Sequence, residues 1–425
     1  MINRFIKDAV LYALPMFLAK SIGLILLPIY TRYLGPADFG FVEFVAAAST
    51  MLLLILPLEI NQAVARLLPE SMNINRQIII ISTALWFTII VFCIFSGIAY
   101  LFRYPLFELL NLPEKKVDFI PLICLSFLIT AVVNLIQLQF RFTNQSISFI
   151  CINSGVLLSN VALVLYFTKI SRLGLEEYFQ SQILSGLVGI IIGLVFIFRK
   201  YGYLYMKINT KALGKLLSFS LPIVISSIGV ALIGVIDKLM IGSYLGFTEL
   251  GHYGAAARIS AIVGLGFYVI STAMTPIVYR EHKSVETKNL IATLFSVTML
   301  LMSIFLYFIY FYSEEIVKLI AGPLFIGAGK YIFCLTISAI IFHSYIFFMG
   351  MDIEKNTKLL GKLNFISGIL NLLFVLLFFP LYGVWGIIVA GLIANVIRLF
   401  GYIYFSQKYY PLCIYNFASN KIWKN

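Results

Sequence analysis

Residues 77–102 read QIIIISTALWFTIIVFCIFSGIAYLF and contain no charged side chain. An α-helix rises about 1.5 Å per residue, so a helix of this length can cross the roughly 30 Å of hydrocarbon in a bilayer. Transmembrane β-strands would instead alternate apolar and polar residues over segments of about ten residues. The stretch therefore predicts a transmembrane α-helix.

Similar apolar runs recur along the whole chain, which has 425 residues, 61% of them hydrophobic and only 12% charged. A soluble domain is about 45–50% apolar and about 25% charged, so this chain must place much of its apolar surface against lipid. We predict an all-α integral membrane protein with about twelve transmembrane helices. The predicted spans are 9–33, 38–66, 77–102, 119–140, 147–168, 180–198, 214–243, 250–279, 289–311, 328–350, 361–379 and 384–405.

The net charge of +13 does not indicate nucleic-acid binding, because the basic residues lie in short connections between apolar runs. With the N-terminus placed inside the cell, the inner connections hold roughly twice as many Lys and Arg residues as the outer ones. This asymmetry predicts that both termini are cytoplasmic and that the number of spans is even.

Two eight-residue segments half a chain apart resemble one another. Residues 33–40 read YLGPADFG and residues 244–251 read YLGFTELG. We expect the glycine at the third position, Gly35 in the first copy, to end one helix. The acidic residue at the sixth position, Asp38 in the first copy, would lie near the positive end of the next helix. A shared polar turn at this spacing indicates an internal duplication.

The duplication predicts two six-helix bundles, residues 1–205 and residues 206–425. Six spans in each half place the two copies in the same orientation, so the bundles would be related by a pseudo-twofold axis along the membrane normal. Many transporters have this architecture and bind their substrate between the halves. Duplication in a channel or a scaffold protein is the alternative interpretation.

Four segments resemble a known family, the polysaccharide biosynthesis proteins that act as O-antigen flippases. They are residues 236–246 (IDKLMIGSYLG), 251–256 (GHYGAA), 27–35 (LPIYTRYLG) and 65–70 (ARLLPE). These flippases belong to the multidrug/oligosaccharidyl-lipid/polysaccharide superfamily. The resemblance implies a MATE-like fold with a central cavity and a transport cycle of alternating access.

The resemblance also implies a substrate and a location. The substrate would be an undecaprenyl-diphosphate-linked oligosaccharide, such as the O-antigen unit of lipopolysaccharide, moved from the inner to the outer leaflet of the bacterial inner membrane. Membrane lipids and other polysaccharide assembly proteins would be its partners. Ion coupling would drive the transport.

Two other functions stay open. A multidrug efflux antiporter of the same superfamily would favour an acidic cavity, whereas the two deepest charges here are basic. A polytopic polysaccharide polymerase would usually need a large outer loop, and the longest outer connection, residues 103–118, is short. The sequence holds no GxxxxGK[ST] loop, metal-ligand cluster or catalytic-triad spacing. We therefore expect no enzyme activity, no cofactor and no metal.

Charged residues within spans are costly and are candidates for function. Lys20 lies near the middle of the first span, and Arg258 lies roughly 12 Å into the eighth. We predict that both line the substrate cavity and contact the diphosphate of the lipid. The alternative is that they pair with carboxylates to hold the two halves together.

Three carboxylates in the spans are candidates for ion coupling. Glu43 and Glu59 lie on the second span, and Asp237 lies near the outer end of the seventh, beside Lys238. A carboxylate in a cavity of low dielectric constant has a raised pKa and could exchange a proton in each cycle. A local salt bridge is the alternative role.

The fourth span carries a polar face formed by Thr130, Asn134, Gln137 and Arg141. Their spacings of four, three and four residues place them on one side of a helix. A polar stripe in lipid must face protein or water. We predict that Asn134, Gln137 and Arg141 line the substrate cavity, with hydrogen bonds between helices as the alternative.

Overall fold

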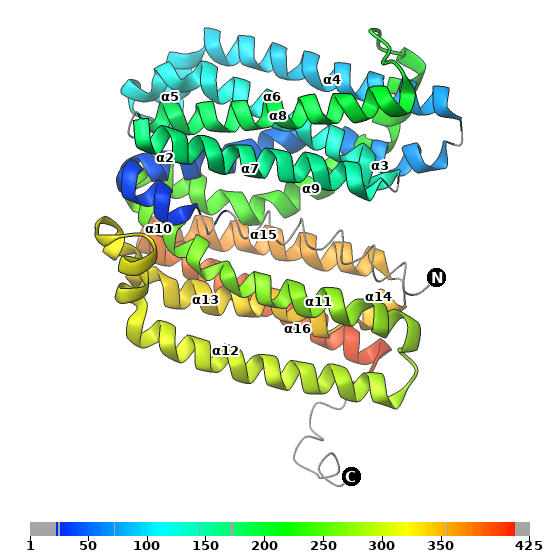
Figure 1. Cartoon of the computed structure of the whole chain (residues 1–425). Coiled ribbons are helices and arrows are strands. Elements are labelled where there is room, and N and C mark those ends of the chain that lie inside the picture. Colours follow the sequence, from blue (N-terminus) through cyan, green and yellow to red (C-terminus); the bar gives the residue numbers. More distant parts are fainter. Residues whose placement is uncertain are drawn as a thin grey trace. The chain divides into compact units, whose positions relative to one another are not determined.

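The computed structural model describes residue 23 and residues 26–412, except residues 72, 144, 171–172 and 355. Within this part of the chain every regular element is a helix (Figure 1). The prediction of an all-α fold is confirmed. Lys20 lies outside the described residues. The chain divides into two compact units, Met1–Gly251 and His252–Asn425.

The first unit contains eight α-helices in its described part, and α10 begins in it. The elements are α2 (Leu27–Ile55), α3 (Ile60–Glu70), α4 (Ile74–Leu101), α5 (Arg103–Leu109), the 3-10 helix η1 (Glu114–Phe119), α6 (Ile120–Phe142), α7 (Ser146–Ile170), α8 (Leu175–Tyr201), α9 (Thr210–Tyr244) and α10 (Phe247–Ser260).

A core at one end of the first unit joins α3, α4, α6 and α9. Ile60, Val64 and Leu68 recur every four residues on α3, and all three are at most 1% exposed. This spacing gives the helix one apolar face, which packs against Ile81 of α4 and Phe140 of α6 among others. The core holds the starts of α4 and α9 and the end of α3 in one cluster.

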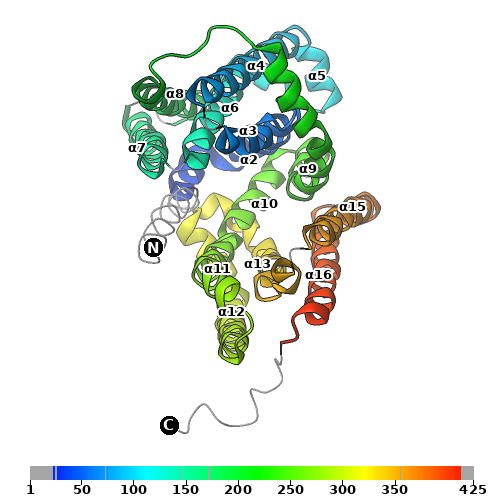
Figure 2. The ribbon, with the colours of Figure 1, turned by 90° about the vertical axis from the view of Figure 1, so that its right-hand side faces the viewer.

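The second unit also packs its helices side by side, as the view along them shows (Figure 2). After α10 it contains α11 (Ile262–Glu281), α12 (Val285–Ile320), η2 (Pro323–Ala328), α13 (Gly329–His343), η3 (Ser344–Phe347), α14 (Gly350–Ile353), α15 (Thr357–Tyr382) and α16 (Val384–Tyr409). Helix α13 contacts α12 and α16, and α15 contacts α16.

Large apolar side chains cover much of the outer surface of the helices. On α12, for example, Leu300, Leu301, Ile304, Tyr307 and Phe308 are 48–62% exposed. Such a continuous apolar band is unfavourable in water but is what a lipid-facing helix needs. The chain is therefore a multi-pass membrane protein.

Ten helical stretches among the described residues are long and apolar enough to cross a membrane. The two other predicted spans are 9–33, most of which lies outside the described residues, and 214–243. The latter falls within α9, which is continuous but is not one of the ten. The total of about twelve stays a prediction.

The second predicted span, 38–66, is broken. Helix α2 ends at Ile55, and α3 begins at Ile60. Pro57 lies in the gap and has no backbone N–H to continue the helix. The next two residues, Leu58 and Glu59, have φ angles of 51° and 52°, a left-handed conformation that is rare outside glycine.

The contacts and the sequence repeat divide the chain at different points. Helix α9 belongs to the second half of the repeat, yet it packs on α2 and falls in the first compact unit. The predicted boundary between residues 205 and 206 separates the two copies of the sequence repeat. That it also separates two six-helix bundles stays a prediction.

Candidate functional site

In both repeated turns the glycine at the third position has a positive φ angle. Gly35 has a φ of 69° and Gly246 a φ of 87°, a region that glycine enters without steric penalty. Gly35 interrupts α2, and Gly246 lies between α9 and α10. Both glycines end a helix, as the sequence predicted.

The turns also pack against each other within the first unit. A Cβ atom added at Gly40 would overlap the carbonyl oxygen of Phe247, and one added at Gly251 would overlap the carbonyl oxygen of Pro36. Gly40 and Gly251 are equivalent positions of the repeat, as are Pro36 and Phe247. The contact is therefore reciprocal and brings two backbones together where only glycine fits.

Lys116, in η1, contacts residues of both repeated turns. Its Nζ donates a hydrogen bond to Asp38 Oδ1 at 3.0 Å and lies 4.5 Å and 5.0 Å from the ring centres of Phe41 and Phe247. Cation–π contacts contribute about 0.5–1 kcal/mol at exposed sites and more where water is excluded. Asp38 thus lies in the first turn after Gly35, as predicted, and also has a partner from a distant loop.

Glu43 and Lys238 form a buried ion pair between α2 and α9. Lys238 Nζ lies 2.5 Å from Glu43 Oε2, and the side chain of Glu43 is only 1% exposed, against 25% for Lys238. The two residues come from opposite halves of the repeat. Pairing of this kind allows a charge to persist in a membrane span. Glu43 thus pairs with a cation from the other half of the repeat. The alternative pairing of Lys20 and Arg258 with carboxylates stays a prediction.

The other two predicted coupling carboxylates lie in the same unit. Glu59 is 9% exposed and occupies the left-handed break between α2 and α3. Asp237 precedes the paired Lys238 on α9 and is half-buried. Their role in ion coupling stays a prediction.

Arg258 lies in the second unit, on α10, and is half-buried. Because Lys20 lies outside the described residues, the predicted convergence of these two cations on one cavity stays untested.

The polar face of α6 exists as predicted. Thr130, Asn134 and Arg141 are exposed and Gln137 is half-buried, whereas the opposite face is buried. Thr130 lines a hollow of about 120 Å³ between α2, α6 and α8, together with polar side chains that include Ser126 and Gln182. Ligand pockets usually measure about 300–1,000 Å³. This hollow therefore suits water better than a sugar chain, and the predicted sugar contacts of Asn134, Gln137 and Arg141 stay untested.

Arg398 of α16 is a charged residue whose surroundings the sequence did not reveal. It is 8% exposed, donates to Asn364 Oδ1 at 2.9 Å and to the carbonyl of Phe342 at 3.3 Å, and stacks on the rings of Phe342, Tyr345 and Tyr402. Tyr402 lies one turn further along α16, whereas Asn364, Phe342 and Tyr345 come from three other segments, so no local pattern in the sequence predicts those three. Arg398 is a structural cation of the second unit.

Among the described residues, no three His, Cys, Asp or Glu side chains are grouped so that they could hold a metal ion.

A family model described as "Polysaccharide biosynthesis protein" matches residues 5–282. The chain belongs to this family. A protein of the Lsg locus of Haemophilus influenzae is 22% identical over 411 residues, which cover 89% of this chain and 94% of that protein. The family recognised in the repeated segments is thus confirmed.

Solved structures show the same fold. The lipid II flippase MurJ, in an inward closed conformation, matches with a TM-score of 0.76 and 16% identity, over 94% of this chain and 87% of that one. An inward-facing multidrug resistance MATE transporter matches with a TM-score of 0.66 and 13% identity, over 92% and 94%. This polysaccharide biosynthesis protein therefore has a MATE-like fold, and the solved structures that share it are those of a flippase and a transporter.

Proposed function

We propose that this chain is a flippase for a lipid-linked oligosaccharide. It moves an undecaprenyl-diphosphate-linked glycan, such as an O-antigen unit, from the cytoplasmic to the outer leaflet of the bacterial inner membrane by ion-coupled alternating access. The observation that carries this proposal is the family match over residues 5–282, combined with the fold of a lipid II flippase.

The site geometry supports alternating access. The reciprocal contact of Gly40 and Gly251 joins the two repeats by backbone packing, and the Glu43–Lys238 pair joins them by charge. Both contacts lie between helices that carry equivalent turns of the repeat. Such contacts can break and form as units when two halves rock.

Particular residues have proposed roles in this cycle. Lys20 and Arg258 contact the diphosphate as fixed cations, and Asn134, Gln137 and Arg141 contact the sugars. Among Glu43, Glu59 and Asp237, Glu43 is the strongest candidate for ion coupling, because it is the most buried and its cation partner is already in place.

Deletion of the gene tests the proposal. A flippase predicts that single lipid-linked units accumulate on the cytoplasmic face, where a membrane-impermeant lectin or glycosidase cannot reach them in intact spheroplasts. Restoring the gene should release them to the outer face.

Two other outcomes would contradict the proposal. Single units exposed on the outer face would indicate a polymerase that acts after translocation. A normal glycan with altered drug sensitivity would indicate a multidrug antiporter, and a multidrug resistance MATE transporter is among the solved structures that share the fold.

A further inference from the structure

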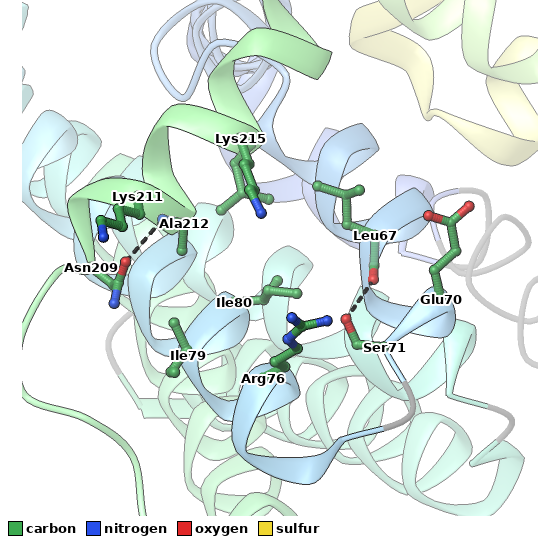
Figure 3. Close-up of a pocket in the computed structure, with 11 residues that line it drawn as sticks. Leu67, Glu70, Ser71, Arg76, Ile79, Ile80, Asn209, Lys211, Ala212 and Lys215 are labelled. Carbon is green, nitrogen blue, oxygen red and sulfur yellow. Dashed lines mark hydrogen bonds between the residues drawn. The ribbon is translucent and has the colours of Figure 1, made fainter.

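A hollow of about 440 Å³ opens at the end of the first unit where α4 and α9 begin and α3 ends (Figure 3). Charge asymmetry predicts that this end faces the cytoplasm. Basic side chains line it from two helices, namely Arg76 of α4 and Lys211 and Lys215 of α9. We call it the basic hollow.

These cations occupy positions that weaken the helices. Arg76 lies in the first turn of α4 and Lys211 in the first turn of α9, and neither first turn contains an acidic residue. The N-terminus of a helix carries a partial positive charge and favours anions. Lys211 and Lys215 are also four residues apart, where like charges repel. A bound anion would remove all of these penalties.

One acidic residue, Glu70 at the end of α3, also lines the hollow. It pairs with Arg66 at 3.0 Å, and both side chains are more than half exposed. Among the described residues, Arg76, Lys211 and Lys215 form no ion pair. In Figure 3 the charged groups of Arg76 and Lys215 point into the space between the helices. The hollow therefore keeps a net positive charge.

Part of the lining of the basic hollow is apolar, and we call this part the apolar floor. It consists of Leu67, Ile79, Ile80, Ala212 and Leu216. A free inorganic anion gains nothing from such a floor. A lipid presents both a phosphate and the first carbons of its chain, and so matches both parts of the lining.

The segment before α9 fixes the geometry of the hollow. Residues 202–209 lie along α4, where Trp86 Nε1 donates to the carbonyl of Tyr205 at 3.0 Å. The backbone N–H groups of Tyr205 and Asn209 donate to Ser82 at 3.0 Å and Thr83 at 3.2 Å. Asn209 then caps α9 through Ala212 N at 2.9 Å. The start of α9 is thus held against α4 without a ligand.

We propose that the basic hollow binds the phosphate of a lipid head group, with Arg76, Lys211 and Lys215 as its ligands. The lipid is either the diphosphate-linked substrate before translocation or a bulk anionic phospholipid. Binding of a lipid phosphate in the basic hollow does not rest on the proposed function. The lining residues of the first unit would bind it even if the protein transported nothing.

Calorimetric titration of the purified full-length chain in an uncharged detergent tests this. The probes are farnesyl diphosphate, dihexanoyl-phosphatidylglycerol and inorganic pyrophosphate. The test variant is Arg76→Gln with Lys211→Gln and Lys215→Gln. The matched control is Lys283→Gln with Lys358→Gln and Lys362→Gln, which removes equal charge from exposed residues on the same predicted side.

We expect the test variant to bind farnesyl diphosphate at least tenfold more weakly, and the control to change by less than twofold. The single variant Lys215→Gln should show an intermediate loss of affinity for farnesyl diphosphate. It replaces the triple variant in the test if the triple variant does not fold. Preference for farnesyl diphosphate over phosphatidylglycerol would identify the diphosphate lipid as the ligand, and equal binding would identify phospholipid in general.

Two results would overturn the proposal. An equal loss in the control variant would show that only general surface charge acts. Pyrophosphate binding as tightly as farnesyl diphosphate would show that the apolar floor plays no part and that no lipid is recognised.

Discussion

A charge buried among membrane helices persists only when other parts of the chain compensate it. In the second unit, Arg398 of α16 is compensated by the side chain of Asn364 and the carbonyl of Phe342, and Tyr402 donates to the same Asn364 oxygen at 3.2 Å. The stability of the second unit therefore depends in part on these few polar contacts.

Replacing Asn364 with Leu should destabilise the protein, because Arg398 and Tyr402 both lose their acceptor. The expected loss is about 1–3 kcal/mol, measured as a lower melting temperature of the purified protein. Asn364→Asp keeps the acceptor and should retain most of the stability. A melting temperature for Asn364→Leu equal to that of the wild type would contradict the structural role of this network.

Glu43 and Lys238 allow folding and transport to be separated. Glu43→Gln should cost about 1–3 kcal/mol of stability, less than the 3–5 kcal/mol for a fully buried pair, because Lys238 is partly exposed. The exchange of charges in Glu43→Lys with Lys238→Glu should restore the melting temperature. If Glu43 couples transport to an ion, the exchange should not restore glycan export at matched protein levels, and full recovery of export would show that the pair is only structural.

Between the elements of the first unit, backbone meets backbone at the reciprocal contact of the two repeated turns. Gly40→Ala and Gly251→Ala each place a methyl group onto a backbone carbonyl of the other turn. Backbone cannot move aside as a side chain can, so each should cost about 1–3 kcal/mol or more and should reduce export.

Gly97→Ala, on the exposed face of α4, is the matched control. A Cβ there meets nothing within 4 Å, so alanine should be neutral or should stabilise the helix by up to about 1 kcal/mol. Melting temperatures of the three purified variants check this. Equal values for Gly40→Ala and Gly97→Ala would show that the turns do not pack as described.

The elements also show what the sequence could and could not predict. Apolar runs and the repeated turn predicted the helical fold, the family and the glycines that end helices, because these depend on local composition. The break at Leu58 and Glu59 was missed, because Pro57 within an apolar run is compatible with either a kink or a straight helix.

For the molecule as a whole, long-range pairing limited the prediction. Glu43 was recognised as a candidate, but its partner Lys238 is 195 residues away, and one sequence does not say which of several buried charges will meet. The basic hollow was missed for the same reason. In the sequence its cations served only as evidence for the orientation of the chain in the membrane. Their convergence depends on how the segment before α9 lies along α4.

Lipid translocation by the purified chain tests the central claim most directly. The chain is reconstituted into vesicles that carry the lipid-linked glycan of its own source, and a membrane-impermeant glycosidase is added outside. The account predicts that glycan in the inner leaflet becomes accessible at a rate that rises with the amount of protein and falls in Glu43→Gln. Inner-leaflet glycan that stays protected with folded protein present, and with the coupling ion gradient applied in either direction, would contradict it.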